Sequence, residues 1–343
     1  MAAYRRLLLA ATLLALAVIA LGAYVRLSDA GLGCPDWPGC YGHLIGVPEA
    51  GHEQQAAQAA YPDRPLDAAK AWKEMLHRYL AGTLGLLILA IAGLAWQKTM
   101  RRRQSPALPT LLLGVVGLQA LLGMWTVTLL LRPLTVTLHL IGGMTTLSLL
   151  VALLLREFRP PAPAAAPPGL RLLAAGALLA VIAQITLGGW VSSNYAALAC
   201  PDFPQCQGQW RPAMDFAEGF SVHRELGMNA AGAALSGEAL TAIHWAHRLG
   251  AALVALVGSG LAFGLLRTGQ RRWRAWGGLI AGLLLAQLGL GVANVLLGLP
   301  LALAVLHNVG AALLLTAMVA VNVALQRRPA ALPSPSGVAQ QAA

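Results

Sequence analysis

Long apolar runs dominate the chain and recur along its whole length. Each run holds about twenty mostly apolar residues, which is enough to cross about 30 Å of hydrocarbon as a helix that satisfies its own backbone hydrogen bonds. The runs are 7–26, 73–96, 108–130, 134–155, 171–192, 240–266, 275–297 and 301–325. The pattern predicts an all-α transmembrane fold with eight helices. The first run exceeds the 7 to 15 apolar residues of a secretory signal, so we expect it to be retained as a helix.

The rarest residues of the chain repeat at an offset of about 168, which indicates two copies of one structural unit. The repeated positions are Cys34 and Cys200, Cys40 and Cys206, His77-Arg78 and His247-Arg248, and His139 and His307. With four helices per unit, both units enter the bilayer from the same side. We therefore expect two four-helix bundles related by a pseudo-two-fold axis along the membrane normal. The predicted divisions are an N-terminal half 1–158, a Pro/Ala-rich linker 159–170, a C-terminal half 171–328 and a disordered tail 329–343.

Composition and charge agree with a membrane protein and indicate its orientation. The chain is 57% hydrophobic and only 11% charged, whereas about a quarter of an average soluble domain is charged. The net charge of +11 would suit a nucleic-acid partner, but 15 of the 24 basic residues fall on the connections of one side. By the positive-inside rule that side is the cytoplasm. This predicts no nucleic-acid partner, both termini in the cytoplasm of a bacterial inner membrane, and the long loops 28–71 and 193–238 outside.

All four cysteines lie in one motif, C-P-D-(W/F)-P-x-C, which occurs once in each long loop. On the outer face thiols are readily oxidised, and two prolines can bend this short spacing into disulfide range. The disulfides Cys34–Cys40 and Cys200–Cys206 are the favoured interpretation. Free thiols and a metal site are the alternatives, although the spacing fits no common zinc pattern. The motif does not distinguish a redox-active disulfide from a structural one.

Four histidines lie inside the predicted helices, where an ionisable side chain is costly. His77, His139, His247 and His307 are expected about five to seven residues inside the outer ends of helices two and four of each bundle, roughly 8 to 11 Å deep. Paired imidazoles at matched depth on facing helices are typical of a bis-histidine haem site. Zinc or copper would usually need further ligands that do not repeat here. A hydrogen-bonded contact between helices is the simpler alternative for any one histidine.

Charged neighbours accompany two of these histidines. Arg78 and Arg248 are placed either to pair with haem propionates or to extend towards the membrane interface. Glu74 shares a helical face with His77, where it would act as a general base or cation stabiliser, or else pair with Arg78. Its counterpart in the second half is His244, so the halves are built alike but differ chemically.

One further repeated element is a glutamine followed four residues later by glycine in three helices. It occurs at Gln119, Gln184 and Gln287. We assign these residues to close helix packing and leave them out of the site.

The motifs together resemble the haem A synthase family, in its cysteine-bearing bacterial form. The segments that carry the resemblance are 31–40 (GLGCPDWPGC), 74–81 (EMLHRYLA), 122–127 (LGMWTV), 244–250 (HWAHRLG), His139 and His307. The resemblance covers all eight helices and implies a membrane oxidoreductase that oxidises the C8 methyl of haem O to the formyl group of haem A by successive hydroxylations.

The resemblance also implies roles for individual residues and partners. His247 and His307 would be the axial iron ligands of a haem b cofactor, His77, His139 and Arg78 would bound the substrate haem, and Glu74 would be the essential acid. Haem O synthase and an unidentified electron carrier are the implied partners. The alternatives are a diheme b-type cytochrome for electron transfer, which needs the histidines but not Glu74, and a haem-delivery or assembly protein.

Overall fold

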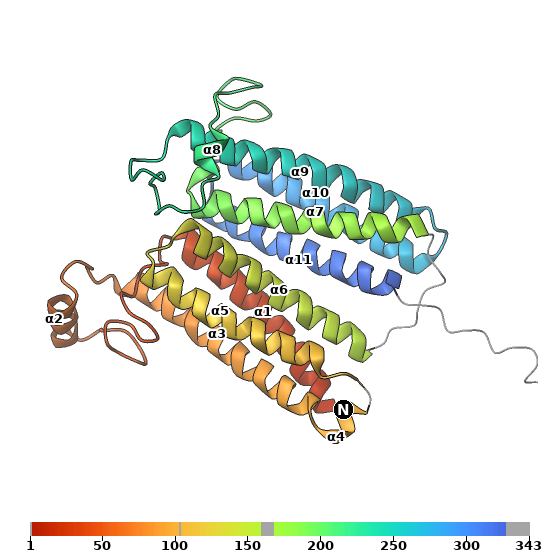
Figure 1. Cartoon of the computed structure of the whole chain (residues 1–343), viewed down its shortest axis with the longest axis horizontal. Coiled ribbons are helices and arrows are strands. Elements are labelled where there is room, and N and C mark those ends of the chain that lie inside the picture. Colours follow the sequence, from red (N-terminus) through yellow and green to blue (C-terminus); the bar gives the residue numbers. More distant parts are fainter. Residues whose placement is uncertain (1, 103, 159–167, 327–343) are drawn as a thin grey trace, which may run out of the picture.

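The computed structural model of the chain describes residues 2–102, 104–158 and 168–326. Eight long helices form the body of the molecule (Figure 1). They are α1 (Ala2–Leu27), α3 (Ala68–Ala95), α5 (Ala107–Thr128), α6 (Pro133–Phe158), α7 (Pro168–Ser193), α9 (Gly237–Leu266), α10 (Arg271–Leu296) and α11 (Leu301–Gln326). All eight are long and apolar enough to cross a membrane. The prediction of an all-α fold with eight transmembrane helices is confirmed.

The remaining helical elements are short and lie outside the membrane-spanning set. They are α2 (Gly51–Ala60), α4 (Lys98–Arg101), the 3-10 turn η1 (Ala196–Leu198) and α8 (Phe216–Gly219). The α2 helix and α8 belong to the two long loops, which lie together at one end of the molecule (Figure 1). The predicted linker, apart from residues 168–170, and the predicted tail 329–343 lie outside the described residues.

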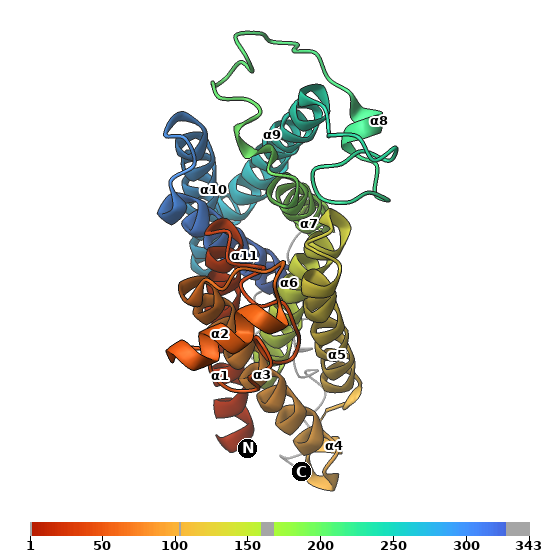
Figure 2. The ribbon, with the colours of Figure 1, turned by 90° about the vertical axis from the view of Figure 1, so that its left-hand side faces the viewer.

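The long helices form two groups of four that follow the two repeats. In the first group α1 packs on α3, α3 on α5, α5 on α6 and α6 on α1; in the second α7, α9, α10 and α11 close in the same order. The groups meet through α1 with α11, α6 with α7, and α6 with α11. Figure 2, seen from the loop end, shows the first group below the second. This arrangement is consistent with the predicted pseudo-two-fold axis.

Two helices begin earlier than their apolar runs predict. The α3 helix starts at Ala68, where the Asp67 side chain accepts a hydrogen bond from the Lys70 amide, and α9 starts at Gly237, where Ser236 caps the Ala239 amide. Both caps satisfy amides that a helix start leaves unpaired. The extra turns are polar and therefore escape a search for apolar runs. His77 and His247 consequently lie nine and ten residues after their helix starts, deeper along the helix than predicted.

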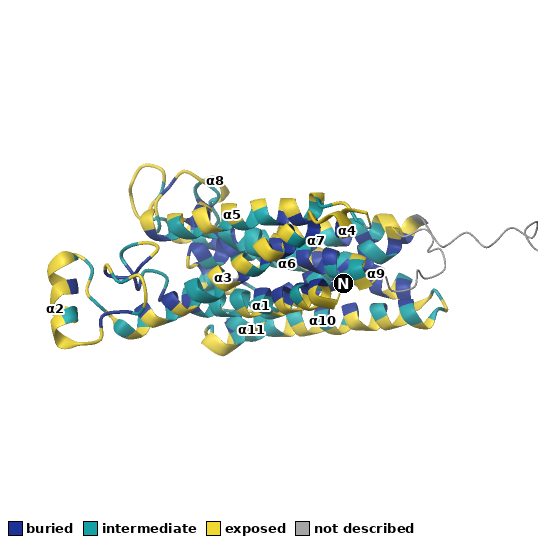
Figure 3. Cartoon of the chain, turned by 90° about the horizontal axis from the view of Figure 1, so that it is seen from below, coloured by how far each residue is buried: buried dark blue, intermediate teal, exposed yellow. Residues whose placement is uncertain are grey.

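The short turns that join α5 to α6 and α10 to α11 fix these pairs as antiparallel neighbours. Leu130 and Leu131 adopt positive φ angles of 53° and 56°, as does Leu299 at 62°, next to Gly298 at 70°. Side chains buried between the helices form a continuous apolar core, and exposed residues lie along the outward sides (Figure 3). The core therefore holds the eight helices in fixed register, which sets the position of the residues described next.

Candidate functional site

Each long loop contains a disulfide within its repeated motif. Cys34 is bonded to Cys40 with the Cα atoms 4.8 Å apart, and Cys200 to Cys206 with the Cα atoms 4.6 Å apart. The predicted pairing within each loop is confirmed, and the alternatives of free thiols and a metal site are excluded for these cysteines. All four are fully buried.

The aspartate of each motif shapes the loop around its disulfide. The Asp36 carboxylate accepts hydrogen bonds from the amides of Tyr41 (2.6 Å) and Gly42 (2.9 Å). The Asp202 carboxylate accepts them from Gln207 (2.6 Å) and Gly208 (2.8 Å) in the same way. These bonds hold the pKa of Asp202 below its usual range, with the Gly208 amide the largest cause. The two loops are therefore copies of one structure and not only of one motif.

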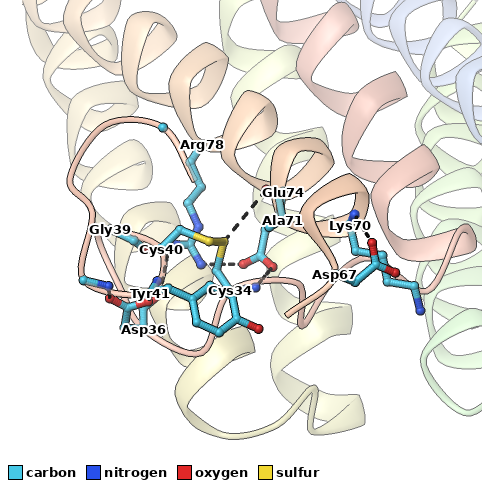
Figure 4. The surroundings of a disulfide bond; sticks show 12 residues. Cys34, Asp36, Gly39, Cys40, Tyr41, Asp67, Lys70, Ala71, Glu74 and Arg78 are labelled. Carbon is cyan, nitrogen blue, oxygen red and sulfur yellow. Dashed lines mark hydrogen bonds and ion pairs between the residues drawn. A yellow bond between two sulfur atoms is a disulfide. The ribbon is translucent and has the colours of Figure 1, made fainter. Parts of the chain in front are cut away.

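Arg78 and Arg248 fasten these loops to the helices that carry the histidines. Arg78 donates to the main-chain carbonyls of Asp36 (3.0 Å), Pro38 (3.2 Å) and Gly39 (2.5 Å), as Figure 4 shows for the loop around Cys34. Arg248 donates to the carbonyls of Cys200 (3.0 Å), Asp202 (2.6 Å) and Gln205 (2.6 Å). In this structure the guanidinium groups thus serve as loop anchors. Pairing of these arginines with haem propionates stays a prediction. The Nε atom of Arg248 could donate such a bond, because it is buried without a partner among the described residues.

Glu74 is buried and lies under the first disulfide loop. Its Oε2 accepts a hydrogen bond from the Cys34 amide at 3.0 Å, and its Oε1 pairs with Arg78 one turn later. The predicted ion pair with Arg78 is therefore present. At the equivalent position His244, also buried, donates from Nδ1 to the Ala196 carbonyl at 3.1 Å. Both residues bind the main chain at the start of their long loop, but only the first half has a carboxylate there.

The structure brings the four predicted histidines together as two pairs. His77 on α3 lies close enough to His139 on α6 to interact electrostatically, and His247 on α9 does the same with His307 on α11. The Nδ1 atoms of His77, His139 and His307 are buried without a hydrogen-bond partner among the described residues. Such imidazoles are rare in a packed interior and indicate a missing partner for the ring. Each pair can supply two nitrogen ligands from facing helices.

A glycine of the neighbouring helix lies against every one of these rings. A β-carbon added at Gly22 would lie 2.9 Å from Cε1 of His77, and one at Gly188 would lie 3.2 Å from Cε1 of His247. The corresponding distance is 3.4 Å both from Gly123 to His139 and from Gly291 to His307. These glycines make room for the imidazoles between α1 and α3, α5 and α6, α7 and α9, and α10 and α11.

Gln184, which was assigned to helix packing, lies in the contact between α7 and α9 and also reaches the ring of His247. Its amide nitrogen lies 3.0 Å from Nδ1 of His247 and also donates to the His247 carbonyl at 3.0 Å. A β-carbon at Gly250 would overlap its carboxamide. The signal that could have found this contact is the spacing, because Gln184 lies one helical turn before Gly188, which faces the same ring.

Two histidines on facing helices, with space for the rings, suit iron in a porphyrin, since the macrocycle supplies the other four ligands. Among residues 2–102, 104–158 and 168–326 no three His, Cys, Asp or Glu side chains gather as a site for a bare metal ion.

Comparison with known proteins identifies the family. The COX15-CtaA profile, described as cytochrome oxidase assembly protein, matches residues 5–319. The chain belongs to the COX15-CtaA family. A heme A synthase of Shewanella oneidensis is 46% identical over 311 residues, which cover 90% of this chain and 92% of the relative. One of Methylobacterium radiotolerans is 32% identical, covering 94% and 91%, and one of Halalkalibacterium halodurans is 27% identical, covering 91% and 94%.

These findings confirm the resemblance that the sequence motifs indicated. A COX15-CtaA protein with eight apolar helices is a multi-pass membrane protein. The match runs through both halves and includes all four histidines and Glu74.

Proposed function

We propose that this protein is a membrane oxidoreductase that converts haem O to haem A for terminal oxidases. One observation carries the proposal. The two histidine sites are built alike, but only the first has a carboxylate beside it, that of Glu74. Relatives named heme A synthase match nine tenths of the chain, which supports the same activity.

The two histidine pairs take different haems in this proposal. His247 and His307 would hold a resident haem b, and His77 and His139 would bind the substrate haem O. The buried, unpartnered ring nitrogens and the glycine beside each ring support this use of the histidines. Arg78 and Arg248, one residue after His77 and His247, keep the outer loops over both sites and contribute to propionate binding.

The reaction replaces C–H bonds of an unactivated methyl group by C–OH in two successive steps, and the geminal diol loses water to leave the formyl group. A bound haem supplies the redox chemistry that amino-acid side chains lack. The residues of the first half position the substrate: His77 and His139 fix its plane, and Glu74 holds or moves a proton at Oε1 or Oε2. With water as the source of the added oxygen, the change from methyl to formyl releases four protons and four electrons, and the electrons pass to an external electron acceptor.

The orientation follows from the positive-inside rule. We propose that the connections with Lys98, Arg101, Arg267 and Arg271 face the cytoplasm of a bacterial cell together with both termini. The disulfide loops then lie on the oxidising outer side, where such bonds persist. Haem O synthase is proposed as the source of the substrate.

The test is chromatography of haems extracted from a haem O-producing cell with and without the protein. A new formyl-bearing haem is the expected result, and unchanged haem O would remove the proposed activity.

A diheme b-type cytochrome is the second candidate, and one observation favours it. Both Glu74 oxygens are engaged, one by the Cys34 amide and one by Arg78, as in a purely structural carboxylate. The extracted pigment would then be ordinary haem b only.

A further inference from the structure

Three of the four histidines share one local arrangement that involves two helices. On the first helix a glutamine lies four residues before the glycine that faces the ring. On the second helix another glycine lies three residues after the histidine. The sets are Gln119, Gly123, His139 and Gly142; Gln184, Gly188, His247 and Gly250; and Gln287, Gly291, His307 and Gly310. Both intervals are close to one helical turn, so all four residues lie at the contact between the two helices.

The second glycine of each set makes room for the glutamine. A β-carbon at Gly142, Gly250 or Gly310 would overlap the side chain of Gln119, Gln184 or Gln287 respectively. Because the overlap involves the carboxamide end, each glutamine reaches across to the turn that follows its histidine. Of the three, Gln184 contacts its ring. The amide nitrogens of Gln119 and Gln287 are buried without a partner among the described residues.

Gln184 shows how the carboxamide engages the ring. It lies 3.0 Å from Nδ1 of His247, while its Oε1 is buried without a partner among the described residues. A histidine that binds iron through one ring nitrogen normally donates its other N–H to an acceptor, which fixes the ring and raises its basicity. Iron bound through Nε2 would leave the proton on Nδ1, and the carboxamide of Gln184 would then turn over to present Oε1 to it, giving up the bond from its amide nitrogen to the His247 carbonyl.

The fourth histidine has no glutamine at the equivalent position. The repeat offsets of 166 and 170 place Val18 at the position of Gln184 and Leu80 at the position of Gly250. Gly22 is kept, and it lies against the His77 ring. The glutamine and the glycine that accommodates it are thus replaced together. Nδ1 of His77 is buried without a partner among the described residues, as are Nδ1 of His139 and of His307, so His247 is the ring that bonds to its glutamine.

We propose that Gln184 is a positioning residue that fixes His247 as a permanent haem ligand, whereas His77 has no glutamine to hold it. The proposal rests on the proposed function, in which both histidines bind haem iron. An enzyme whose substrate and product are haems must release one haem and keep the other. An unsupported imidazole can turn away from the metal at little cost, whereas a hydrogen-bonded one must first break that bond. His247, in the half proposed to keep its haem, is the one of these four rings in the described structure whose nitrogen bonds to a glutamine.

The first experiment removes the support from the second half. In Gln184→Val, resident haem should pass to an excess of a haem-scavenging apoprotein about tenfold faster than in the wild type. The midpoint potential of the remaining haem should shift in the positive direction, because a less basic ligand stabilises the oxidised iron less. Thr186→Val is the matched control, since its exposed hydroxyl bonds only to the Ile182 carbonyl of its own helix. It should leave both the rate and the potential unchanged.

The second experiment transfers the support to the first half. Val18→Gln combined with Leu80→Gly recreates the arrangement around His77 and should slow the release of haem O from that half about tenfold. KM and kcat for haem O should fall together, because the substrate is held more tightly and the product leaves more slowly. This gain of binding tests the proposal even if Gln184→Val folds poorly.

His247→Ala separates the proposal from the function on which it rests. Retention of tightly bound haem by His247→Ala would overturn the ligand assignment itself. Loss of haem from His247→Ala with an unchanged release rate and potential in Gln184→Val would leave that assignment intact and overturn the role of Gln184. Unchanged haem O release in the double variant would show that a glutamine at this position does not hold the histidine, and would overturn the role of Gln184.

Discussion

Arg26 and Ser192 occupy equivalent positions in the two repeats, and they contact each other. The Arg26 guanidinium donates to the Ser192 carbonyl at 2.7 Å, across a sequence separation of 166. Asp29 and Tyr195 are 166 apart as well, and the Tyr195 hydroxyl donates to Asp29 Oδ1 at 3.0 Å. A two-fold axis brings residues near it against their own counterparts. These contacts are therefore consistent with the predicted axis passing between α1 and α7 at their outer ends.

Arg26 is expected to contribute to the association of the halves. Its guanidinium also lies over the Tyr195 ring, 4.1 Å from the centroid. Arg26→Met removes this contact and the bond to Ser192, and should lower the free energy of unfolding by about 1 to 2 kcal/mol. Thermal unfolding in detergent measures the change. Arg132→Met is the control, because its ion pair with Glu225 is exposed and should contribute at most about 0.5 kcal/mol.

Glu74→Gln separates catalysis from haem ligation. Glutamine keeps an acceptor for the Cys34 amide but cannot ionise, so the variant should fold and keep its haem b. Formation of haem A should fall by about two orders of magnitude, as for the loss of a general acid or base. His244→Ala, at the equivalent position, should be much milder. The measurement is haem A formed per bound haem b. An active Glu74→Gln variant would favour an electron-transfer cytochrome over a haem A synthase.

Each disulfide should stabilise the protein modestly. Closing a loop of so few residues contributes about 2 kcal/mol in the chain-entropy model. Replacing Cys34 and Cys40 together by serine should therefore weaken the protein without unfolding it, since Arg78 still binds three carbonyls of the loop. Chemical denaturation of this variant and of the matching Cys200 and Cys206 variant checks the magnitude. Complete unfolding of either one would show that the anchors cannot hold the loop alone.

The glycine beside His77 should be essential although it has no functional group. Gly22→Ala would place a β-carbon 2.9 Å from Cε1 of His77 and push the ring aside. Haem A formation should fall at least tenfold while the haem b of the other half remains. Gly82→Ala on α3 is the control, because nothing lies within 4 Å of its added β-carbon. It should keep activity and gain up to about 1 kcal/mol in helix stability.

The second outer loop should open in acid. The Glu218 carboxylate binds the Ser236 hydroxyl and the Asn229 amide, and chiefly the Ser236 bond holds its pKa below the ordinary 4.5. A lowered folded-state pKa gives stability that is full above about pH 4.5 and is lost as the pH falls through the folded value. Cleavage of the loop by an acid-active protease should rise in that window. Glu218→Gln should remove the pH dependence; an unchanged profile would contradict this role.

The sequence was sufficient for the helices, the repeat and the disulfides because each depends on local spacing or composition. It placed His77 and His247 too near the outer helix ends, since the polar turns capped by Asp67 and Ser236 lack an apolar signal. The contacts of Arg78 with loop carbonyls could not be predicted, because main-chain groups carry no sequence signature. The sequence pattern around a glutamine in an apolar helix is the same whether the side chain packs between helices or supports a ligand. Only the neighbouring helix shows that Gln184 faces His247.

The three carbonyl contacts of Arg248 also fix the rotational phase of α9. A slip of this helix by one residue would move it about 1.5 Å along its axis and turn its side chains by about 100°. His247, the adjacent residue, would then face away from α11. Because the carbonyls of Cys200, Asp202 and Gln205 belong to a disulfide-closed loop, they cannot follow such a slip. The loop outside the membrane thus sets the direction in which an imidazole points within it.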